Sequence, residues 1–265
     1  MLVRELPGTA SLAENFPSFC DLPLGRAVKF SARLLLETGL WANIKDQRRI
    51  NGDLSSHMDL LDLTGDNTIV QIGANDGMRD DPINHILASK DVRSVLVEPS
   101  PIAFEALSKL HMERPNTHLV QGAIGSTSGK LPLYVPAVRG KELYSSVWTS
   151  RSREQAAGEV KRNLGRRALK NCEVMRISVP IQTAAELLEQ CSVAPEDVAV
   201  LVCDTEGQDT EIVHSFLDAT ALPEIIFYEQ LHVPEPPAVE LKARLDDLGY
   251  EIKETAKDVL AVLSS

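Results

Sequence analysis

From residue 66 onward, short apolar runs alternate with amphipathic segments, and this alternation constrains the fold more than any other feature of the chain. Runs in which consecutive residues are apolar, without alternating polar residues, predict strands that are buried on both faces. The predicted strands span residues 68–73, 92–98, 117–124, 174–181, 197–204, 224–229, 250–255 and 258–263. The predicted helices span residues 81–90, 101–110, 183–190, 208–217 and 238–249. Buried strands joined by helices indicate a doubly wound, mostly parallel α/β sheet with helices on both faces.

The two ends of the chain depart from this alternation. Residues 250–255 and 258–263 are too close for a helical crossover, so they predict a C-terminal antiparallel hairpin. Residues 22–45 carry apolar side chains at helical spacing and predict one or two helices. The apolar face of those helices is free to cover a sheet edge, to meet a second subunit in a homodimer, or to close over a ligand. We therefore predict an N-terminal helical extension over residues 1–65 and one α/β domain over residues 66–265.

Charge and cysteine usage narrow the class of protein. The formal net charge is −11, which argues against nucleic acid as the main partner because phosphate binding favours a basic surface. Cys20, Cys172, Cys191 and Cys203 show no metal-binding spacing and are interpreted as reduced thiols. The N-terminus lacks the apolar core of a signal peptide, and no apolar run is long enough to cross a bilayer. These features predict a cytoplasmic protein without a membrane span.

The first strand of the alternating region runs into a glycine loop, I-V-Q-I-G-A-N-D-G over residues 69–77. Gly73 and Gly77 suit an ordinary tight strand-to-helix turn, and they equally suit a loop whose backbone lies against a bound cofactor. Ligands of doubly wound sheets bind beyond the carboxyl ends of the strands, where this loop is placed. The loop lacks the third glycine of a dinucleotide fingerprint, and Asp76 makes it acidic, which disfavours a pyrophosphate.

A second acidic position follows 21 residues after Gly77, where Glu98 ends the strand V-R-S-V-L-V-E. A carboxylate there accepts hydrogen bonds from both hydroxyls of a ribose, although a surface glutamate at a strand end is the simpler alternative. Together with the glycine loop, Glu98 predicts a nucleoside cofactor. The acidic loop favours S-adenosylmethionine, whose amino group and sulfonium are cationic.

Four motifs resemble, in the right order, those of the FkbM-type methyltransferases: I-V-Q-I-G-A-N-D-G, V-L-V-E-P-S-P, Q-G-A-I-G-S-T-S-G-K-L-P-L-Y and V-L-V-C-D-T-E-G-Q-D. The resemblance spans residues 66 to 263 and implies a class I fold with a seven-stranded, Rossmann-like methyltransferase sheet. It also implies an S-adenosylmethionine-dependent enzyme, usually an O-methyltransferase of natural products or glycans. The chain departs from the family in having Gln71 where aspartate is usual and Asp209 where glutamate is usual.

The resemblance further implies which residues bind the cofactor. The glycine loop would hold the methionyl part, with Gln71 as a hydrogen-bond partner of its amino group, and Glu98 would hold the ribose. Pro99 and Ser100 would flank the adenosine, and residues 123–124 would offer an apolar wall to the adenine. The implied cofactor-binding set is Gln71, Gly73, Ala74, Asn75, Gly77, Glu98, Pro99, Ser100, Ala123, Ile124 and Asp204.

Acidic side chains also follow the next two apolar strands. Asp204 and Glu206 come after one of them, and Glu229 and His232 come after the other, so parallel pairing would bring all four to the cofactor edge. In one hypothesis Asp204 or His232 is the general base for an acceptor hydroxyl, with Glu206 as a third catalytic residue. In the other, Asp204, Glu206 and Glu229 hold a divalent ion such as Mg²⁺, which prefers oxygen ligands. Asp209 either joins this site or stabilises the helix that starts beside it.

Residues 139–176 form a basic insert. They contain ten basic and four acidic residues, a net charge of +6, so the remainder of the chain carries −17. A solvated helix over residues 153–169 is the simple interpretation, and a lid that recognises an anionic acceptor is the alternative. The stretch Y-S-S-V-W adds hydroxyls and aromatic rings that suit a polar, ring-shaped substrate. The predicted substrate-binding residues are Ser145, Ser146, Trp148 and Glu229.

These features predict an S-adenosylmethionine-dependent O-methyltransferase that acts on a hydroxyl of a glycan or small natural product. If the basic insert recognises this acceptor, the acceptor is expected to be anionic. The alternative from another class is a catalytically inactive S-adenosylmethionine-binding or scaffold protein of the same fold, which Gln71 keeps open. An NAD-dependent oxidoreductase is disfavoured by the missing glycine and the acidic loop.

Overall fold

The computed structural model describes residues 40–61, 63–78, 81–138, 150, 152–158, 160–161, 172–220 and 222–264. The chain divides into two compact units. One comprises residues 1–45 and 133–177, and the other comprises residues 46–132 and 178–265. The second unit contains the main sheet and all predicted site residues outside the basic insert.

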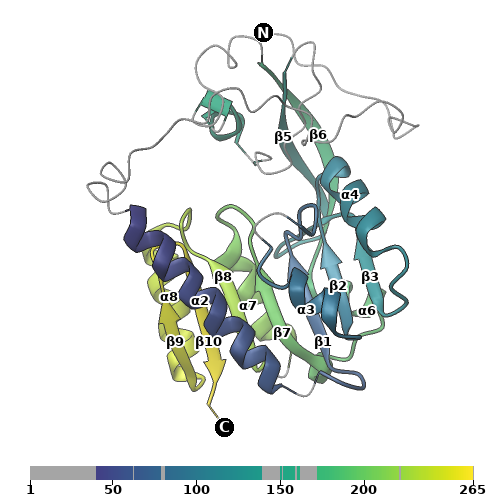
Figure 1. Ribbon diagram of the computed structural model, residues 1–265. Coiled ribbons are helices and arrows are strands. Elements are labelled where there is room, and N and C mark those ends of the chain that lie inside the picture. Colours follow the sequence, from purple (N-terminus) through teal and green to yellow (C-terminus); the bar gives the residue numbers. More distant parts are fainter. Residues whose placement is uncertain are drawn as a thin grey trace. The chain divides into compact units, whose positions relative to one another are not determined.

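Seven strands form the main sheet, in the order β3-β2-β1-β7-β8-β10-β9 (Figure 1). The strands are β1 (Thr68–Ile72), β2 (Arg93–Val97), β3 (Thr117–Val120), β7 (Val198–Cys203), β8 (Ile225–Glu229), β9 (Tyr250–Glu254) and β10 (Asp258–Leu263). Neighbours from β3 to β8 pair in parallel, whereas β10 pairs antiparallel with both β8 and β9. The predicted doubly wound, mostly parallel seven-stranded sheet with a C-terminal antiparallel hairpin is therefore confirmed.

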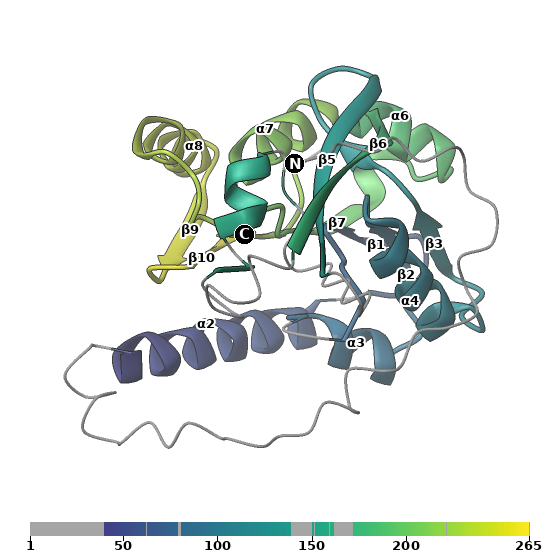
Figure 2. The same ribbon diagram turned by 90° about the horizontal axis from the view of Figure 1, so that it is seen from above.

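Helices cover both faces of this sheet (Figure 2). The helices are α2 (Leu40–Leu60), α3 (Asn84–Ser89), α4 (Pro101–His111), α6 (Ala184–Gln190), α7 (Asp209–Ala219) and α8 (Glu235–Asp247), with the short 3-10 helix η3 (Pro195–Asp197). One apolar cluster joins the sheet to α6, α7 and α8, and a second joins it to α2, α3 and α4. Along β1, Val70 belongs to the first cluster and Ile69 to the second, because successive side chains of a strand point to opposite faces.

The C-terminal half of α2 packs on one face of the sheet. Ile50, Leu54 and Met58 recur at four-residue spacing and are buried in the second cluster, while polar residues occupy the other sides of the helix. Of the helices predicted over residues 22–45, only the last six residues lie within α2, and the rest lie outside the described part of the chain. Neither α2 nor any other helix in the described ranges is both long and apolar enough to cross a bilayer.

Two predicted strands differ from the structure. The strand predicted over residues 117–124 is interrupted, because β4 (Ala123–Ile124) leaves the main sheet and pairs in parallel with β6 (Cys172–Gln182). Strand β6, predicted over residues 174–181, lies in a second sheet of order β4-β6-β5, which includes β5 (Gly129–Val138). Most residues of β6 are half-buried or exposed, so this strand lacks the two apolar faces that the interior of a doubly wound sheet requires.

The basic insert is described only in part. Residues 153–158 and 160–161 are helical, at the start of the helix predicted over residues 153–169, and residues 162–171 lie outside the described part of the chain. Ser150 forms an isolated antiparallel bridge with Tyr134 of β5.

A capping box fixes the start of α6. The Glu186 N–H donates to Thr183 Oγ1 at 3.2 Å, and the Thr183 N–H donates to Glu186 Oε2 at 2.9 Å. We expect Thr183→Ala to lower the free energy of unfolding by about 1 kcal/mol, because the Glu186 N–H loses its acceptor and the Glu186 carboxylate loses the hydroxyl that donates to it. Thr183→Ser keeps the hydroxyl and should remain near wild type. Urea denaturation compares the three proteins, and equal stability of the two variants would show that the hydroxyl does not stabilise the helix.

Candidate functional site

The strand order of the main sheet reverses at β1. Strands β2 and β3 extend the sheet on one side of β1, and β7 and β8 extend it on the other. In doubly wound sheets the carboxyl ends of the strands at such a switch point are where ligands bind. Residues 73–77 follow β1, Glu98 follows β2 and Asp204 follows β7. The structure therefore brings these three predicted segments to one edge of the sheet.

Packing within the chain accounts for both glycines of the loop. Gly73 has a φ of +82°, and a Cβ there would lie 1.9 Å from the carbonyl oxygen of Asp204. Gly77 has a φ of +72°, and a Cβ there would lie 2.7 Å from Cδ1 of Leu107 in α4. Between them, Asn75 also has a positive φ, of 52°. The tight turn is thus a sufficient reason for both glycines, and their presence does not by itself indicate a cofactor.

Glu98 is buried, and each of its carboxylate oxygens accepts a backbone hydrogen bond. The Asn75 N–H donates to Oε2 at 2.9 Å, and the Ser100 N–H donates to Oε1 at 2.7 Å. Burial raises the pKa of Glu98 to about 7; these two donors oppose the rise, and the charges of Asp76 and Asp204 add to it. A carboxylate has about four lone-pair positions, so Glu98 keeps acceptor capacity for two ligand hydroxyls.

Gln71 reaches from β1 to the segment that precedes α3. Its Nε2 donates to Asp81 Oδ2 at 3.2 Å, while Asp81 Oδ1 accepts the backbone N–H groups of Ile83 and Asn84. A carboxylate oxygen accepts hydrogen bonds, so the amide nitrogen of Gln71, and not its oxygen, is the atom that faces Asp81. The amide oxygen, Oε1, therefore makes no hydrogen bond with Asp81. Gln71 Oε1 is buried without a hydrogen-bond partner among the described residues. The same holds for Oγ of Ser100, at the N-terminus of α4.

Ala123 and Ile124 are buried beyond the end of β3. The Gly122 N–H donates to the carbonyl oxygen of Glu98 at 3.2 Å, so the chain passes beside Glu98 just before it enters β4. Pro99 separates Glu98 from Ser100 on the adjacent segment. Ala123 and Ile124 therefore directly follow the residue, Gly122, that contacts Glu98. They form β4 beside β6 and do not continue β3.

Asp209 holds the loop that follows β7. It is 0% exposed, and it accepts the Thr205 N–H on Oδ1 at 3.0 Å and the Gly207 N–H on Oδ2 at 3.1 Å. Burial raises the pKa of Asp209 to about 6, and the charge of Asp204 adds to this effect. These contacts favour the structural alternative for Asp209, at the first turn of α7.

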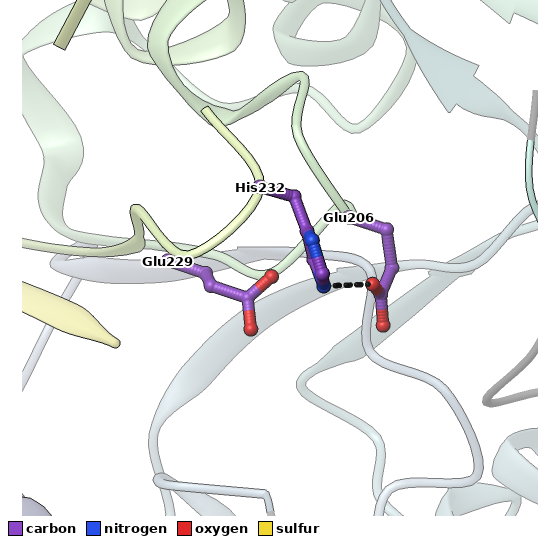
Figure 3. A group of neighbouring side chains, drawn as sticks. All are labelled: Glu206, Glu229 and His232. Atoms are coloured by element: carbon purple, nitrogen blue, oxygen red, sulfur yellow. Dashed lines mark ion pairs between the residues drawn. The ribbon is translucent and has the colours of Figure 1, made fainter. Parts of the chain in front are cut away.

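Three of the predicted residues meet at the ends of β7 and β8. His232 Nε2 lies 3.2 Å from Glu206 Oε2, and one ligand atom from each of His232, Glu206 and Glu229 lies within 4.8 Å of the others (Figure 3). A Cβ at Gly207 would lie 3.0 Å from the carbonyl oxygen of His232, so the two loops are in close contact. The group differs from the set predicted for Mg²⁺, because it contains the imidazole and leaves Asp204 out.

Lys257, in the turn between β9 and β10, belongs to this site but was not among the residues predicted from the sequence. Its Nζ lies 3.5 Å from Glu229 Oε1 and 3.7 Å from Asp204 Oδ2. Burial opposes its charge, yet the carboxylates of Asp204, Asp258 and Glu229 raise the pKa of Lys257. Burial and the charges of Asp204 and Glu206 raise the pKa of Glu229 to about 8 despite the lysine. The predicted C-terminal hairpin could have indicated Lys257. Because β10 pairs antiparallel with β8, the turn before β10 lies at the carboxyl end of β8.

The predicted substrate-binding residues Ser145, Ser146 and Trp148 lie outside the described residues. Glu229 is the fourth member of that set, and it belongs to the group at the ends of β7 and β8. Acceptor recognition by the basic insert therefore stays a prediction.

No protein-family model matches the chain, and no curated protein matches it in sequence. Several solved structures are similar to it in fold. A methyltransferase FkbM from Methylobacillus flagellatus is 10% identical with a TM-score of 0.43, and the match covers 74% of this chain and 43% of that one. Fibrillarin from Aeropyrum pernix, crystallised with natively bound S-adenosyl-L-methionine, is 14% identical with a TM-score of 0.39, covering 76% and 69%. An O-methyltransferase from Thermotoga maritima is 10% identical with a TM-score of 0.37, covering 83% and 65%. The chain thus spans less than half the length of the first of these proteins.

Proposed function

We propose that the chain is an S-adenosylmethionine-dependent methyltransferase whose cofactor binds at the switch point between β1 and β7. The observation that carries the proposal is a pair of buried, unpartnered atoms at this edge, Gln71 Oε1 and Ser100 Oγ. A buried polar atom without a partner costs about 1–3 kcal/mol, and a ligand that supplies the missing donor removes that cost. The series of sequence motifs described above supports the same cofactor.

The residues at the edge suit the two ends of this cofactor. Gln71 Oε1 would accept a hydrogen bond from the ammonium group of the methionyl end, in place of the ion pair that an aspartate would make. Glu98 would accept hydrogen bonds from the ribose hydroxyls, and Ser100, two residues further along the chain, would offer its Oγ for another nucleoside contact. Asp76 and Asp204 add negative charge beside Glu98, which favours a cationic ligand over a pyrophosphate.

When bound, S-adenosylmethionine supplies an electrophilic methyl group on its sulfonium. Transfer breaks the sulfur–methyl bond, forms an oxygen–methyl bond on the acceptor and releases the hydroxyl proton. The chain must therefore align the acceptor oxygen with the methyl group and take up one proton. Asp204 and His232 stand at this edge as proton acceptors, and Glu206 lies 3.2 Å from the imidazole, where it orients the ring.

We propose a hydroxyl of a glycan or small natural product as the acceptor. The strand ends carry Asp204, Glu206 and Glu229, so an anionic group of the acceptor would be repelled at this point. A neutral polyhydroxyl ring avoids that repulsion and donates hydrogen bonds to carboxylates. If the acceptor also carries a phosphate or carboxylate, the basic insert over residues 139–176 is the part of the chain whose charge suits it.

Calorimetric titration with S-adenosylhomocysteine tests the cofactor assignment. We expect saturable binding of S-adenosylhomocysteine, none of NAD, and affinity weakened about 10- to 100-fold in Glu98→Gln, because one acceptor and the charge toward the ribose are lost. Glu113→Gln, an exposed glutamate beyond α4, is the matched control and should bind as wild type. Absence of binding to the wild type would overturn the proposal.

The alternative of an inactive binding or scaffold protein shares the cofactor site and differs in catalysis. Transfer of a radioactive methyl group to hydroxylated acceptors separates the two. Binding of S-adenosylhomocysteine together with turnover that is lost in Asp204→Asn supports the enzyme. Binding without turnover on any acceptor, at saturating cofactor, favours the scaffold.

A further inference from the structure

The group at the ends of β7 and β8 has the composition of a metal site. Figure 3 shows the His232 imidazole between the carboxylates of Glu206 and Glu229. One nitrogen and two oxygen ligand atoms lie within 4.8 Å of one another. Metal–ligand bonds of about 2.0–2.2 Å place such atoms roughly 3–4 Å apart, so modest side-chain rotation closes the set. Glu206 and His232 are 35% and 30% exposed and have room for that rotation.

A second observation points to a ligand. Glu229 is 4% exposed, and its Oε2 is buried without a hydrogen-bond partner among the described residues. Its Oε1 already faces Lys257. A buried carboxylate oxygen with no donor is costly, and a bound cation satisfies it.

The surrounding charges also favour a cation. Lys257 lies beside two of the carboxylates, with its Nζ 3.5 Å from Glu229 Oε1 and 3.7 Å from Asp204 Oδ2. Four charged groups act on Glu229. Asp204 follows β7, Glu206 lies in the loop after it, Asp209 begins α7, and Lys257 lies in the turn between β9 and β10. The negative charges of Asp204, Glu206 and Asp209 act on Glu229, and a cation bound beside it would reduce that repulsion.

We infer that His232, Glu206 and Glu229 bind one divalent transition-metal ion, such as Mn²⁺, Co²⁺ or Zn²⁺. The imidazole decides the class, because Mg²⁺ and Ca²⁺ prefer oxygen ligands alone whereas these ions accept nitrogen and oxygen together. Three protein ligands leave open positions for water or a substrate atom.

The site itself does not depend on the proposed function, but its role does. In a methyltransferase acting on a hydroxyl, a cation at this edge favours loss of the acceptor proton. Asp204, which lies outside the group of three, then remains as the proton acceptor.

Metal binding is measured directly on the full-length protein after treatment with a chelator. We expect one equivalent of Mn²⁺ to bind by electron paramagnetic resonance titration, and Co²⁺ to give a visible absorption band that reports nitrogen and oxygen ligation. His232→Gln should weaken both at least about tenfold. His118→Gln, an exposed histidine on β3, is the matched control and should leave both unchanged. Glu229→Gln, checked for folding by circular dichroism, should weaken binding as His232→Gln does.

The outcomes separate the metal site from the cofactor site. Saturable binding lost in His232→Gln supports the inference, whether or not S-adenosylhomocysteine binds. Absence of Mn²⁺ and Co²⁺ binding, or binding indifferent to His232→Gln, overturns it and leaves Lys257 as the cation that balances Glu229. Equal competition by Mg²⁺ at the same concentration also overturns it, because an oxygen-only site would then be in use. Cofactor titration in excess chelator tests the proposed function on its own.

Discussion

Replacing Gly73 with alanine is expected to lower the free energy of unfolding by about 4 kcal/mol. Two costs combine at this position. An alanine at a φ of +82° adopts a backbone conformation that disfavours a Cβ by about 1–2 kcal/mol. The added Cβ would also lie 1.9 Å from the Asp204 carbonyl oxygen, and this is a backbone atom that a side-chain rotation cannot move away.

Gly65→Ala is the matched control for this substitution. Gly65 has a φ of +68°, close to that of Gly73, but a Cβ there meets nothing within 4 Å. It should cost only the conformational part, about 1–2 kcal/mol. Chemical denaturation of both variants measures the difference, which isolates the contact between the ends of β1 and β7. If the two variants lost equal stability, the close approach would not matter.

This result bears on how glycines in such loops are interpreted. A Gly73→Ala protein that loses activity would do so through the packing of β1 against β7 even if no cofactor touched the loop. The more specific probes of the cofactor are Gln71 and Ser100, whose buried atoms lack partners in the described structure. Substitutions there disturb ligand contacts without placing an atom against backbone.

The architecture was predictable because apolar residues recur with different periodicities in strands and in helices. Fully apolar runs such as those ending at Cys203 and Glu229 fit only the interior of a covered sheet, and the close final pair fits only a hairpin. The individual helices predicted within the N-terminal extension end at residue 45, whereas α2 continues to Leu60, and the reason is the opposite one. The three buried residues of α2 stand four apart among charged neighbours, and their role is visible only once the sheet face they cover is known.

The site was predictable to the level of the sheet edge and not beyond. Parallel strands must bring residues 73–77, Glu98 and Asp204 together, so topology alone located them. The sequence did not show which atoms of these residues already have hydrogen-bond or ion-pair partners within the chain. Asp81 occupies one end of the Gln71 amide, and Lys257 enters from a hairpin that is distant in the chain. Such partners depend on loop geometry, which motifs do not encode.

Glu98 should make stability and cofactor affinity depend on pH in opposite directions. Burial raises the pKa of this carboxyl from an ordinary value of 4.5 to about 7 in the folded protein. Between these values the folded state holds a proton that the unfolded state has released. The free energy of unfolding therefore falls as pH rises through this window, by about 3 kcal/mol for Glu98 alone, and the loss is complete above pH 7.

Glu98→Gln isolates this contribution because its amide does not titrate. The variant is expected to be less stable than wild type near pH 4.5, since one backbone N–H loses its acceptor. That deficit should shrink by about 3 kcal/mol between pH 4.5 and pH 8, as the wild type ionises at a cost the variant does not have. Urea denaturation across the range gives the two curves, and parallel curves would contradict a raised pKa at Glu98.

Cofactor binding should reverse the sign. Ribose hydroxyls donate to the ionised carboxylate, and hydrogen bonds to the charged form lower a pKa. On the proposed function, S-adenosylhomocysteine thus binds the ionised protein more tightly, and its affinity rises as pH passes through about 7 and levels off above it. Calorimetric titration at pH 6 and pH 8 in buffers of different ionisation enthalpy would also register the proton released on binding. An affinity that is flat in the wild type, or that rises equally in Glu98→Gln, would remove Glu98 from the cofactor site and leave it as a loop anchor for Asn75 and Ser100.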